Sequence, residues 1–186
     1  MSIPRINTEP DGLTFKAEYF DTCPAEWNRI IAPLAGASIL QTAEWGEIKG
    51  ARGWIPQYVL WRDASDAIVA AALVLRKKVL GPVEFRYLPR GPLFDPSNVA
   101  LATRIIRDLE SDARKSHALF IKLDRDIAIG YNVPGTEAYR ENKDGLNYLA
   151  LLKERGAVFS EAQIQFANSV WIDLTPDEET LFANMR

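Results

Sequence analysis

The feature that most restricts the fold of this chain is a series of three closely spaced strand-like segments near its middle. They cover residues 54–61, 67–75 and 83–88, and turn-forming residues separate them at 62–66 and 79–82. Strands joined by such short turns pair as an antiparallel meander. An alternation of apolar and polar residues over 13–20 predicts a further strand before the meander.

Helical patterns flank the meander on both sides. Pro24 is expected to open a helix that runs to about Leu34, because proline is tolerated at the first helical position. Thr42 is expected to cap a second helix that ends near Gly50. The inward-facing residues of this second helix are predicted to be Trp45, Ile48 and Ala51.

The second half of the chain alternates helices and strands. An amphipathic helix is predicted after residue 98, and its inner face contains Val99, Ala102, Ile106, Leu109 and Ala113. Residues 118–123 are nearly all apolar, which predicts a strand buried on both sides. A loop over 125–145, a helix over 146–155 that stops at Gly156, and a strand over 166–174 follow. Thr175 and Pro176 then predict the start of a last helix.

Composition excludes several classes of protein. The formal net charge is −3 with charges of both signs interspersed, whereas a dedicated nucleic-acid module concentrates Lys and Arg on one surface. Aromatic residues are expected in the core, so a base-stacking platform is not predicted. The single cysteine, Cys23, cannot form an internal disulfide. With one histidine and no Cys/His spacing, we expect no metal and no cofactor, and the absence of a leader or an apolar span predicts a cytoplasmic protein.

Three stretches combine residues typical of a core with polar groups that a core does not need. The first is Leu-Gln-Thr-Ala-Glu-Trp-Gly-Glu-Ile-Lys over 40–49, and the second is Tyr-Leu-Pro-Arg-Gly-Pro-Leu-Phe-Asp over 87–95. The third is Gln-Ile-Gln-Phe-Ala-Asn over 163–168, which leads to Trp-Ile-Asp-Leu over 171–174.

Together these stretches resemble the FemABX family, bacterial enzymes that move an amino acid from aminoacyl-tRNA onto the peptide of a cell-wall precursor. The resemblance implies an α/β, GNAT-like acyltransferase fold with a mixed, largely antiparallel sheet flanked by helices. It covers essentially this whole chain but only the first half of a full-length member. Residues 1–174 are then one GNAT-like domain, and 175–186 start a helix that leads into a missing second half.

The resemblance also implies a binding site for a UDP-linked or lipid-linked muropeptide. Lys49 is expected to contact phosphate, and Arg90 and Asp95 lie on a stiff loop that lines the same cleft in the family. Tyr87 and Trp45 belong to the same two stretches. The central prediction is that Lys49 and Arg90 converge on one anion-accepting groove.

Each of these residues also has a purely structural interpretation. Lys49 in a last helical turn complements the helix dipole, and Asp95 before the amphipathic helix is a suitable N-cap. Arg90 can pair with a neighbouring acid, and Asp124, after the strand at 118–123, can contact a ligand or stabilise the following loop. No catalytic residue is assigned.

Two other functions are compatible with the same sequence. One is a GNAT-fold acyltransferase that uses another donor, although the glycine-rich loop that cradles the pyrophosphate of acyl-CoA is missing. The other is a non-catalytic module that binds the precursor. Aminoacyl-tRNA is expected to be met by the missing half, and the apolar Leu181, Phe182 and Met185 of the last helix suggest self-association through that helix.

Overall fold

The computed structural model describes residues 5–7, 15–162, 164 and 174–184. The strands are β1 (Arg5–Asn7), β2 (Lys16–Phe20), β3 (Ile55–Arg62), β4 (Ile68–Leu80), β5 (Val83–Leu88), β6 (Leu93–Phe94), β7 (Ala118–Leu123), β8 (Gly130–Tyr131) and β9 (Arg140–Glu141). The helices are α1 (Trp27–Ile31), the short 3-10 helix η1 (Ile39–Gln41), α2 (Ala43–Gly50), α3 (Val99–Lys115), α4 (Lys143–Glu154) and α5 (Glu178–Asn184).

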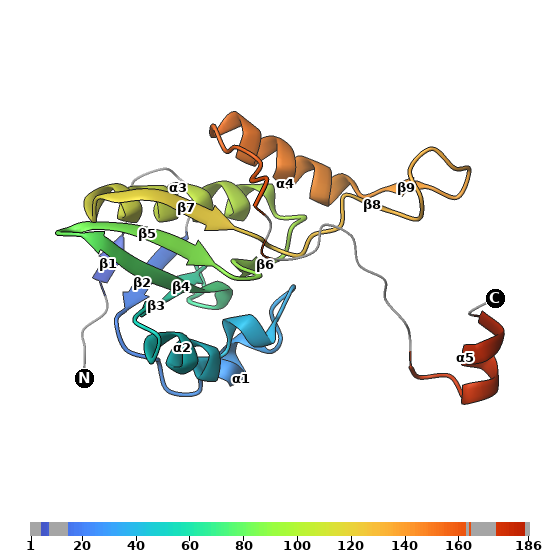
Figure 1. Cartoon of the computed structure of the whole chain (residues 1–186), viewed down its shortest axis with the longest axis horizontal. Helices are drawn as coiled ribbons and strands as arrows, with labels where there is room; N and C mark the ends of the chain where they lie inside the picture. The colour runs from blue at the N-terminus through green and yellow to red at the C-terminus, as the bar shows by residue number, and fades with distance from the viewer. Residues whose placement is uncertain (1–4, 8–14, 163, 165–173, 185–186) are drawn as a thin grey trace.

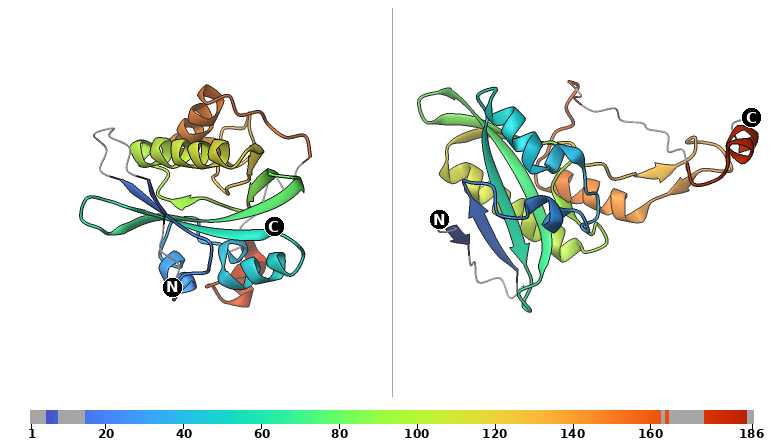
Figure 2. Two further views of the ribbon diagram at one scale, coloured as in Figure 1. Left: turned by 90° about the vertical axis from the view of Figure 1, so that its left-hand side faces the viewer. Right: turned by 90° about the horizontal axis from the view of Figure 1, so that it is seen from below.

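The main sheet has helices on both of its faces. Its strand order is β1-β2-β3-β4-β5-β7, with β6 paired to β4, and every pair is antiparallel except β5–β7. Helices α3 and α4 cover one face, whereas α1 and α2 cover the other (Figures 1 and 2). The mixed α/β architecture with a mostly antiparallel sheet is therefore confirmed. The parallel pair arises because α3 carries the chain back before β7 begins.

The predicted meander is confirmed as β3, β4 and β5. Successive side chains of β4 enter different cores: Val74 packs on the α3 side and Leu73 on the α1–α2 side. This double burial explains the continuous apolar run of the strand, because neither face meets water. β4 extends to Leu80, five residues beyond its predicted end.

The start of α2 is as predicted, but of its predicted inner face only Trp45 packs against the core. The Thr42 hydroxyl accepts a hydrogen bond from the Trp45 backbone N–H at 3.3 Å, which makes it the N-cap. Ile48 and Ala51 are exposed rather than buried. Gly46 is the buried residue of α2, and a Cβ at this position would lie 2.3 Å from the Tyr58 hydroxyl oxygen. A glycine at the contact lets the helix lie close to β3, and this turns Ile48 outward.

Three other elements differ from the sequence prediction. Helix α1 is shorter than predicted and ends at Ile31. In α3, the predicted inner face is buried except for Val99, which is 49% exposed at the first helical position. The predicted loop over 125–145 contains the hairpin β8–β9, and α4 begins at Lys143 rather than at residue 146.

The prediction that β7 is buried on both sides is wrong. Leu119 is 66% exposed and Phe120 is 54% exposed. Within the described residues β7 is the last strand of the sheet, and α3 covers only one of its faces. An apolar strand in the sequence therefore does not by itself indicate a central position.

The C-terminal predictions have mixed outcomes. Gly156 follows α4 with φ +81, as expected for a glycine that ends a helix. The predicted strand over 166–174 lies almost entirely outside the described residues. Helix α5 is present, but the side chain that caps it is Asp177, which accepts a hydrogen bond from the Thr180 N–H, and not Thr175. Phe182 is 67% exposed on this helix, and self-association remains a prediction.

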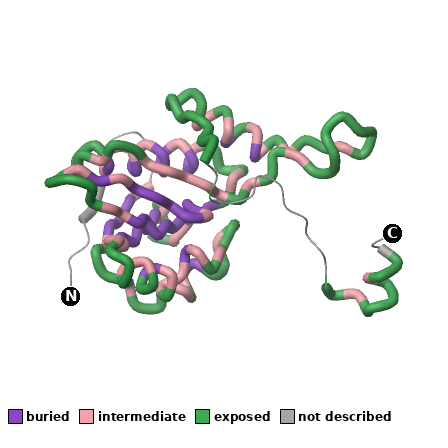
Figure 3. The backbone as a smooth tube through the Cα atoms, in the orientation of Figure 1, coloured by how far each residue is buried: buried purple, intermediate pink, exposed green. Residues whose placement is uncertain are grey.

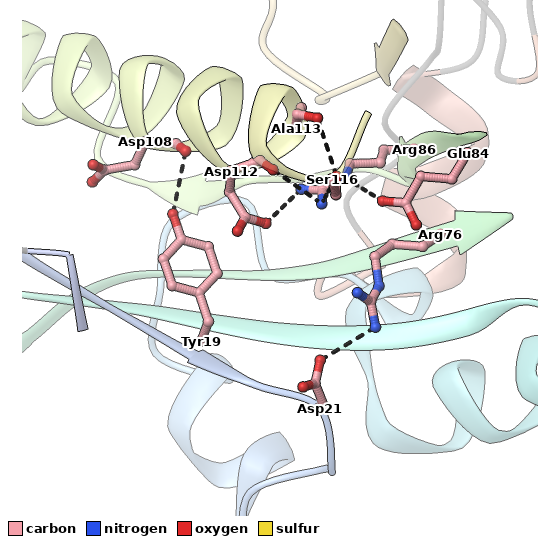
Figure 4. A network of polar contacts seen from close by, with 9 residues as sticks. All are labelled: Tyr19, Asp21, Arg76, Glu84, Arg86, Asp108, Asp112, Ala113 and Ser116. Atoms are coloured by element: carbon pink, nitrogen blue, oxygen red, sulfur yellow. Dashed lines mark hydrogen bonds and ion pairs between the residues drawn. The ribbon is translucent and has the colours of Figure 1, made fainter. Parts of the chain in front are cut away.

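A network of buried polar groups lies between the sheet and the C-terminal half of α3 (Figure 4). The Arg86 guanidinium, which is almost fully buried, pairs with Glu84 at 2.9 Å and with Asp112 at 2.6 Å. It also donates to the Ser116 hydroxyl at 2.6 Å. These contacts fix the end of α3 against β5, the strand that leads to the second motif.

Candidate functional site

The first two sequence motifs are joined by one buried side chain, Gln41. Its amide nitrogen donates to the Pro89 carbonyl at 2.6 Å, and its amide oxygen accepts from the Leu73 N–H at 2.7 Å. The Gln41 backbone carbonyl in turn accepts from the Trp27 indole N–H at 2.7 Å. Both ends of the amide are satisfied and the side chain has no exposed surface, so its role is to hold the start of α2 against the turn after β5.

Gly91 is the other half of this junction. A Cβ at this position would lie 2.7 Å from the Gln41 amide nitrogen, which is closer than real Cβ contacts. Only glycine lets the turn approach the amide, and this is the physical reason for a glycine inside the Pro-Arg-Gly-Pro sequence of the second motif.

Asp124 clamps the turn that carries Arg90. One carboxylate oxygen accepts from the Tyr87 hydroxyl at 2.6 Å, and the other accepts from the Arg90 backbone N–H at 2.6 Å. Arg90 has φ +53, in the left-handed region that residues other than glycine rarely adopt. The clamp offsets the cost of this backbone conformation, and such local strain is common at functional sites.

The Arg90 side chain faces a second acid. Its guanidinium lies 2.8 Å from the Asp126 carboxylate, and the two side chains are 21% and 46% exposed. An ion pair this open to solvent contributes about 1 kcal/mol or less. The guanidinium can therefore exchange Asp126 for an anionic ligand at small cost.

Lys49 and Trp45 lie together on α2. The Lys49 ammonium sits 4.8 Å from the centre of the Trp45 ring, an arrangement that a cation–π attraction stabilises. The Trp45 indole N–H is buried and has no hydrogen-bond partner among the described residues. A buried, unsatisfied donor beside a lysine is a place where a water or a ligand oxygen is expected.

A row of aromatic rings connects α2 to the second motif. The Trp54 backbone N–H donates to the Lys49 backbone carbonyl at 3.1 Å. The centre of the Trp54 ring lies 5.3 Å from that of Phe85 and 6.5 Å from that of Tyr87. Phe85 stacks on the partly exposed Phe120 of β7 at 5.4 Å. Contacts therefore run along the α1–α2 face from Lys49 to Tyr87 and on to the Asp124 clamp.

The structure brings Tyr87 and Arg90 into one cluster and links Lys49 and Trp45 to it through Trp54. No contact between the described atoms joins Lys49 to Arg90 directly. A cavity of about 280 Å³ lies on the α3 side of the sheet, lined by residues that include Ile106, Leu109, Ile121 and Leu152. None of the predicted site residues lines it, so a shared groove for Lys49 and Arg90 remains a prediction.

Asp95 forms no hydrogen bond or ion pair with the cluster among the described residues, and it is not the helix cap. It accepts hydrogen bonds from the Ser97 hydroxyl at 2.7 Å and the Ser97 N–H at 2.9 Å. These two bonds lower the pKa of Asp95. The cap of α3 is Asn98, whose side chain accepts from the Leu101 N–H. The sequence holds two candidate caps three residues apart, and the helix begins at the second.

Arg125 is a polar feature that the sequence did not indicate. Its guanidinium stacks 3.7 Å from the Phe94 ring centre and donates to the Phe94 carbonyl. Two of its nitrogens, Nε and Nη1, are buried without a partner among the described residues, as is the Tyr148 hydroxyl. Burial lowers the pKa of Arg125 to about 10 and raises that of Tyr148 to about 12.

Neither metal chemistry nor a cysteine nucleophile is supported in the described part of the chain. No group of three or more His, Cys, Asp or Glu residues there could hold a metal ion. Cys23 is an exposed residue with a free thiol. Partial burial of its sulfur atom raises the pKa of the thiol, whereas an activated thiolate requires a lowered pKa.

Comparison with known proteins gives the family. A model of the FemAB family matches residues 26–186, which include all three motifs and every residue of the clamp. The chain belongs to the FemAB family. A search of curated proteins found no significant match.

The fold of this FemAB family chain also resembles a solved structure described as "Crystal structure of FemX". The TM-score is 0.58 at 23% sequence identity. The match covers 75% of this chain and 31% of the FemX chain, so the chain spans about a third of the length of that protein.

Two residues on which the site of this FemAB family chain depends were not assigned to it from the sequence, although Asp124 was considered either as a ligand contact or as a residue that stabilises the following loop. The Gln41 amide joins the first two motifs, and the Asp124 carboxylate holds the Arg90 turn. The available signal was position: Gln41 interrupts an apolar stretch just before a helix cap, and Asp124 directly follows a strand. The third motif lies largely outside the described residues.

Proposed function

We propose that this chain is the precursor-binding unit of an aminoacyltransferase that adds an amino acid from aminoacyl-tRNA to the stem peptide of a peptidoglycan precursor. In this proposal residues 1–174 form a GNAT-like domain, and the helix that begins after Thr175 leads into a second unit. The observation that carries the proposal is the junction at Gln41, which ties the lysine-bearing helix and the arginine-bearing turn of a FemAB family chain into one rigid body.

The chemistry asks little of the protein beyond positioning. The ester of an aminoacyl-tRNA is already activated, and the acceptor amine needs to lose a proton and be held in line with it. Lys49 and Arg90 would hold the anionic part of a UDP-linked or lipid-linked muropeptide. Trp45 and Tyr87 would supply apolar surface and a hydroxyl beside it, and Asp95 would lie at the edge of the cleft.

The second unit would bind the aminoacyl-tRNA. We expect the complete protein to act in the cytoplasm, where its donor is made. The 186-residue chain alone is expected to bind precursor without transferring an amino acid. Turnover by the purified chain with aminoacyl-tRNA and precursor would contradict this division of labour.

Calorimetric titration with the UDP-linked muropeptide tests the proposal directly. Lys49→Ala and Arg90→Ala are each expected to weaken binding by about tenfold to a hundredfold, the value of a hydrogen bond to a charged group. Lys153→Ala, on the exposed side of α4, is the matched control and should bind as the unaltered chain does. If all three variants bind equally well, the cluster is not the precursor site.

A further inference from the structure

The tip of the β4–β5 hairpin is unusually apolar. Val79 is 59% exposed and Leu80 is 80% exposed, and the chain reverses at Gly81, which has φ +56. Hairpin turns are normally built from polar residues and glycine, because they project into water. Figure 3 shows this tip as exposed at one end of the sheet. Two adjoining aliphatic side chains in water therefore need an explanation other than packing within the domain.

The start of β7 adds more apolar surface beside the hairpin. Glu84 of β5 is in register with Ala118, so the first residues of β7 lie next to the base of the tip. Leu119 and Phe120 there are 66% and 54% exposed. The four exposed side chains at this end are Val79, Leu80, Leu119 and Phe120, and we call them together the apolar tip.

The cationic residues around the apolar tip are unpaired. Arg52, Lys78 and Lys115 are exposed, and none of them forms an ion pair within the described part of the chain. Lys77 reaches toward Arg52, donating to its carbonyl at 3.1 Å. The chain as a whole carries a net charge of −3, so the positive character of this end is local.

The carboxylates at the same end are already neutralised. Glu84 and Asp112 both pair with the buried Arg86, and Asp21 pairs with Arg76 at 3.2 Å. The Glu84 and Asp112 carboxylates therefore face the buried Arg86, as Figure 4 shows, whereas Asp21, whose side chain is 54% exposed, pairs with Arg76 nearer the surface. The surface offered to a partner combines positive charge with aliphatic side chains.

We propose that the apolar tip and its surrounding Arg52, Lys77, Lys78 and Lys115 bind the surface of an anionic lipid bilayer. Aliphatic side chains enter the interfacial region while lysines remain at the level of the headgroups. Lysines near an anionic membrane each add favourable attraction. A nucleic acid would use stacked aromatic rings, and three of the four apolar side chains here are aliphatic. Among the residues that the structure describes, none of the helices has the length and apolar character of a membrane span.

Vesicle sedimentation tests this proposal with the intact 186-residue chain. The chain should bind vesicles that contain phosphatidylglycerol and should bind neutral phosphatidylcholine vesicles far less. The double variant Val79→Ser/Leu80→Ser should reduce the partition coefficient by about tenfold or more, because two exposed aliphatic side chains are removed from the interface. Lys78→Gln should reduce it about fivefold.

The matched controls are Val158→Ser, a residue that is 91% exposed beyond α4, and Lys153→Gln. Both should bind vesicles as the unaltered chain does, and circular dichroism should show that all variants are folded. Equal binding to neutral and anionic vesicles, or undiminished binding by the double variant, would overturn the proposal. So would binding to a short single-stranded RNA in place of vesicles.

The vesicles contain no precursor, so the result does not depend on the proposed transferase function. A chain that binds muropeptide but not vesicles would refute the bilayer contact alone. A chain that binds vesicles but not muropeptide would refute the precursor site alone.

Discussion

Arg86 is buried and Arg125 is half-buried, and the surroundings of their two guanidinium groups differ completely. Arg86 is enclosed by two carboxylates and a hydroxyl, each within 2.9 Å. Arg125 is enclosed by the rings of Phe94 and Tyr148, and two of its nitrogens have no partner among the described residues. The first arrangement holds the fold together. The second keeps a charge away from water without completing its hydrogen bonds, which is a cost unless a water or a ligand completes them.

The largest effect is expected for Arg86→Met. The substitution leaves Glu84 and Asp112 buried without their cation, and breaking a buried pair in this way typically costs about 3–5 kcal/mol. Urea denaturation should show this loss in the free energy of unfolding. The control is Arg114→Met, whose side chain is 75% exposed and whose replacement should change stability by about 0.5 kcal/mol or less. A small effect for Arg86→Met would mean that the network is not part of the framework.

A smaller effect is expected for Asp112→Asn. The amide keeps the shape of the carboxylate but removes one charge, while Glu84 still pairs with Arg86. The expected loss is about 1–2 kcal/mol, the difference between a charge-assisted hydrogen bond and a neutral one. Combining Asp112→Asn with Arg86→Met should cost less than the sum of the two single changes, because they remove the same interaction. Simple additivity would show that the two groups do not interact in solution.

The smallest effect, and the one of opposite sign, is expected for Arg125→Met. Methionine keeps the contact with Phe94 and removes a charge whose Nε and Nη1 have no hydrogen-bond partner among the described residues, so stability should stay within about 1 kcal/mol or increase. The folded pKa of about 10 lies below the ordinary value of 12.5. The penalty in the unaltered chain is therefore present at neutral pH and is relieved as pH rises through 10.

Denaturation curves between pH 7 and pH 11 check this sign. Any advantage of Arg125→Met over the unaltered chain should be largest near pH 7 and should shrink above pH 10. A loss of several kcal/mol at pH 7 would show instead that the guanidinium of Arg125 is as well satisfied as that of Arg86.

The two arginines also mark what a sequence can and cannot predict. Arg86 lies in an alternating strand and Arg125 follows a strand-ending acid, and nothing in either pattern distinguishes a satisfied charge from an unsatisfied one. Two of the residues that pair with Arg86 are Asp112 and Ser116, and they lie about thirty residues away along the chain. Only the crossover through α3 brings them together.

Local signals were only partly reliable, because Asp95 and Thr175 were predicted as helix caps and neighbouring residues cap those helices instead. The meander, the Thr42 cap and the glycine after α4 depend on residues within a few positions of one another, and all three are present. Burial of β7 and of Ile48 and Ala51 on α2 depends on what packs against them, and these predictions were wrong. For the candidate site, the motifs in the sequence supplied the residue types. The Gln41 junction and the Asp124 clamp can be recognised only from the folded structure.

The hydrogen bonds of the Gln41 amide restrict which residues can replace it. It presents a donor to the Pro89 carbonyl and an acceptor to the Leu73 N–H, at a reach that asparagine, one methylene shorter, does not have. Glutamate would place a carboxylate oxygen against the Pro89 carbonyl oxygen. Leucine would leave the Pro89 carbonyl and the Leu73 N–H buried without the hydrogen bonds of the amide. Of the twenty side chains, only glutamine is long enough and carries both the donor and the acceptor that this place needs. The contact between the helix and the distant turn therefore depends on one residue.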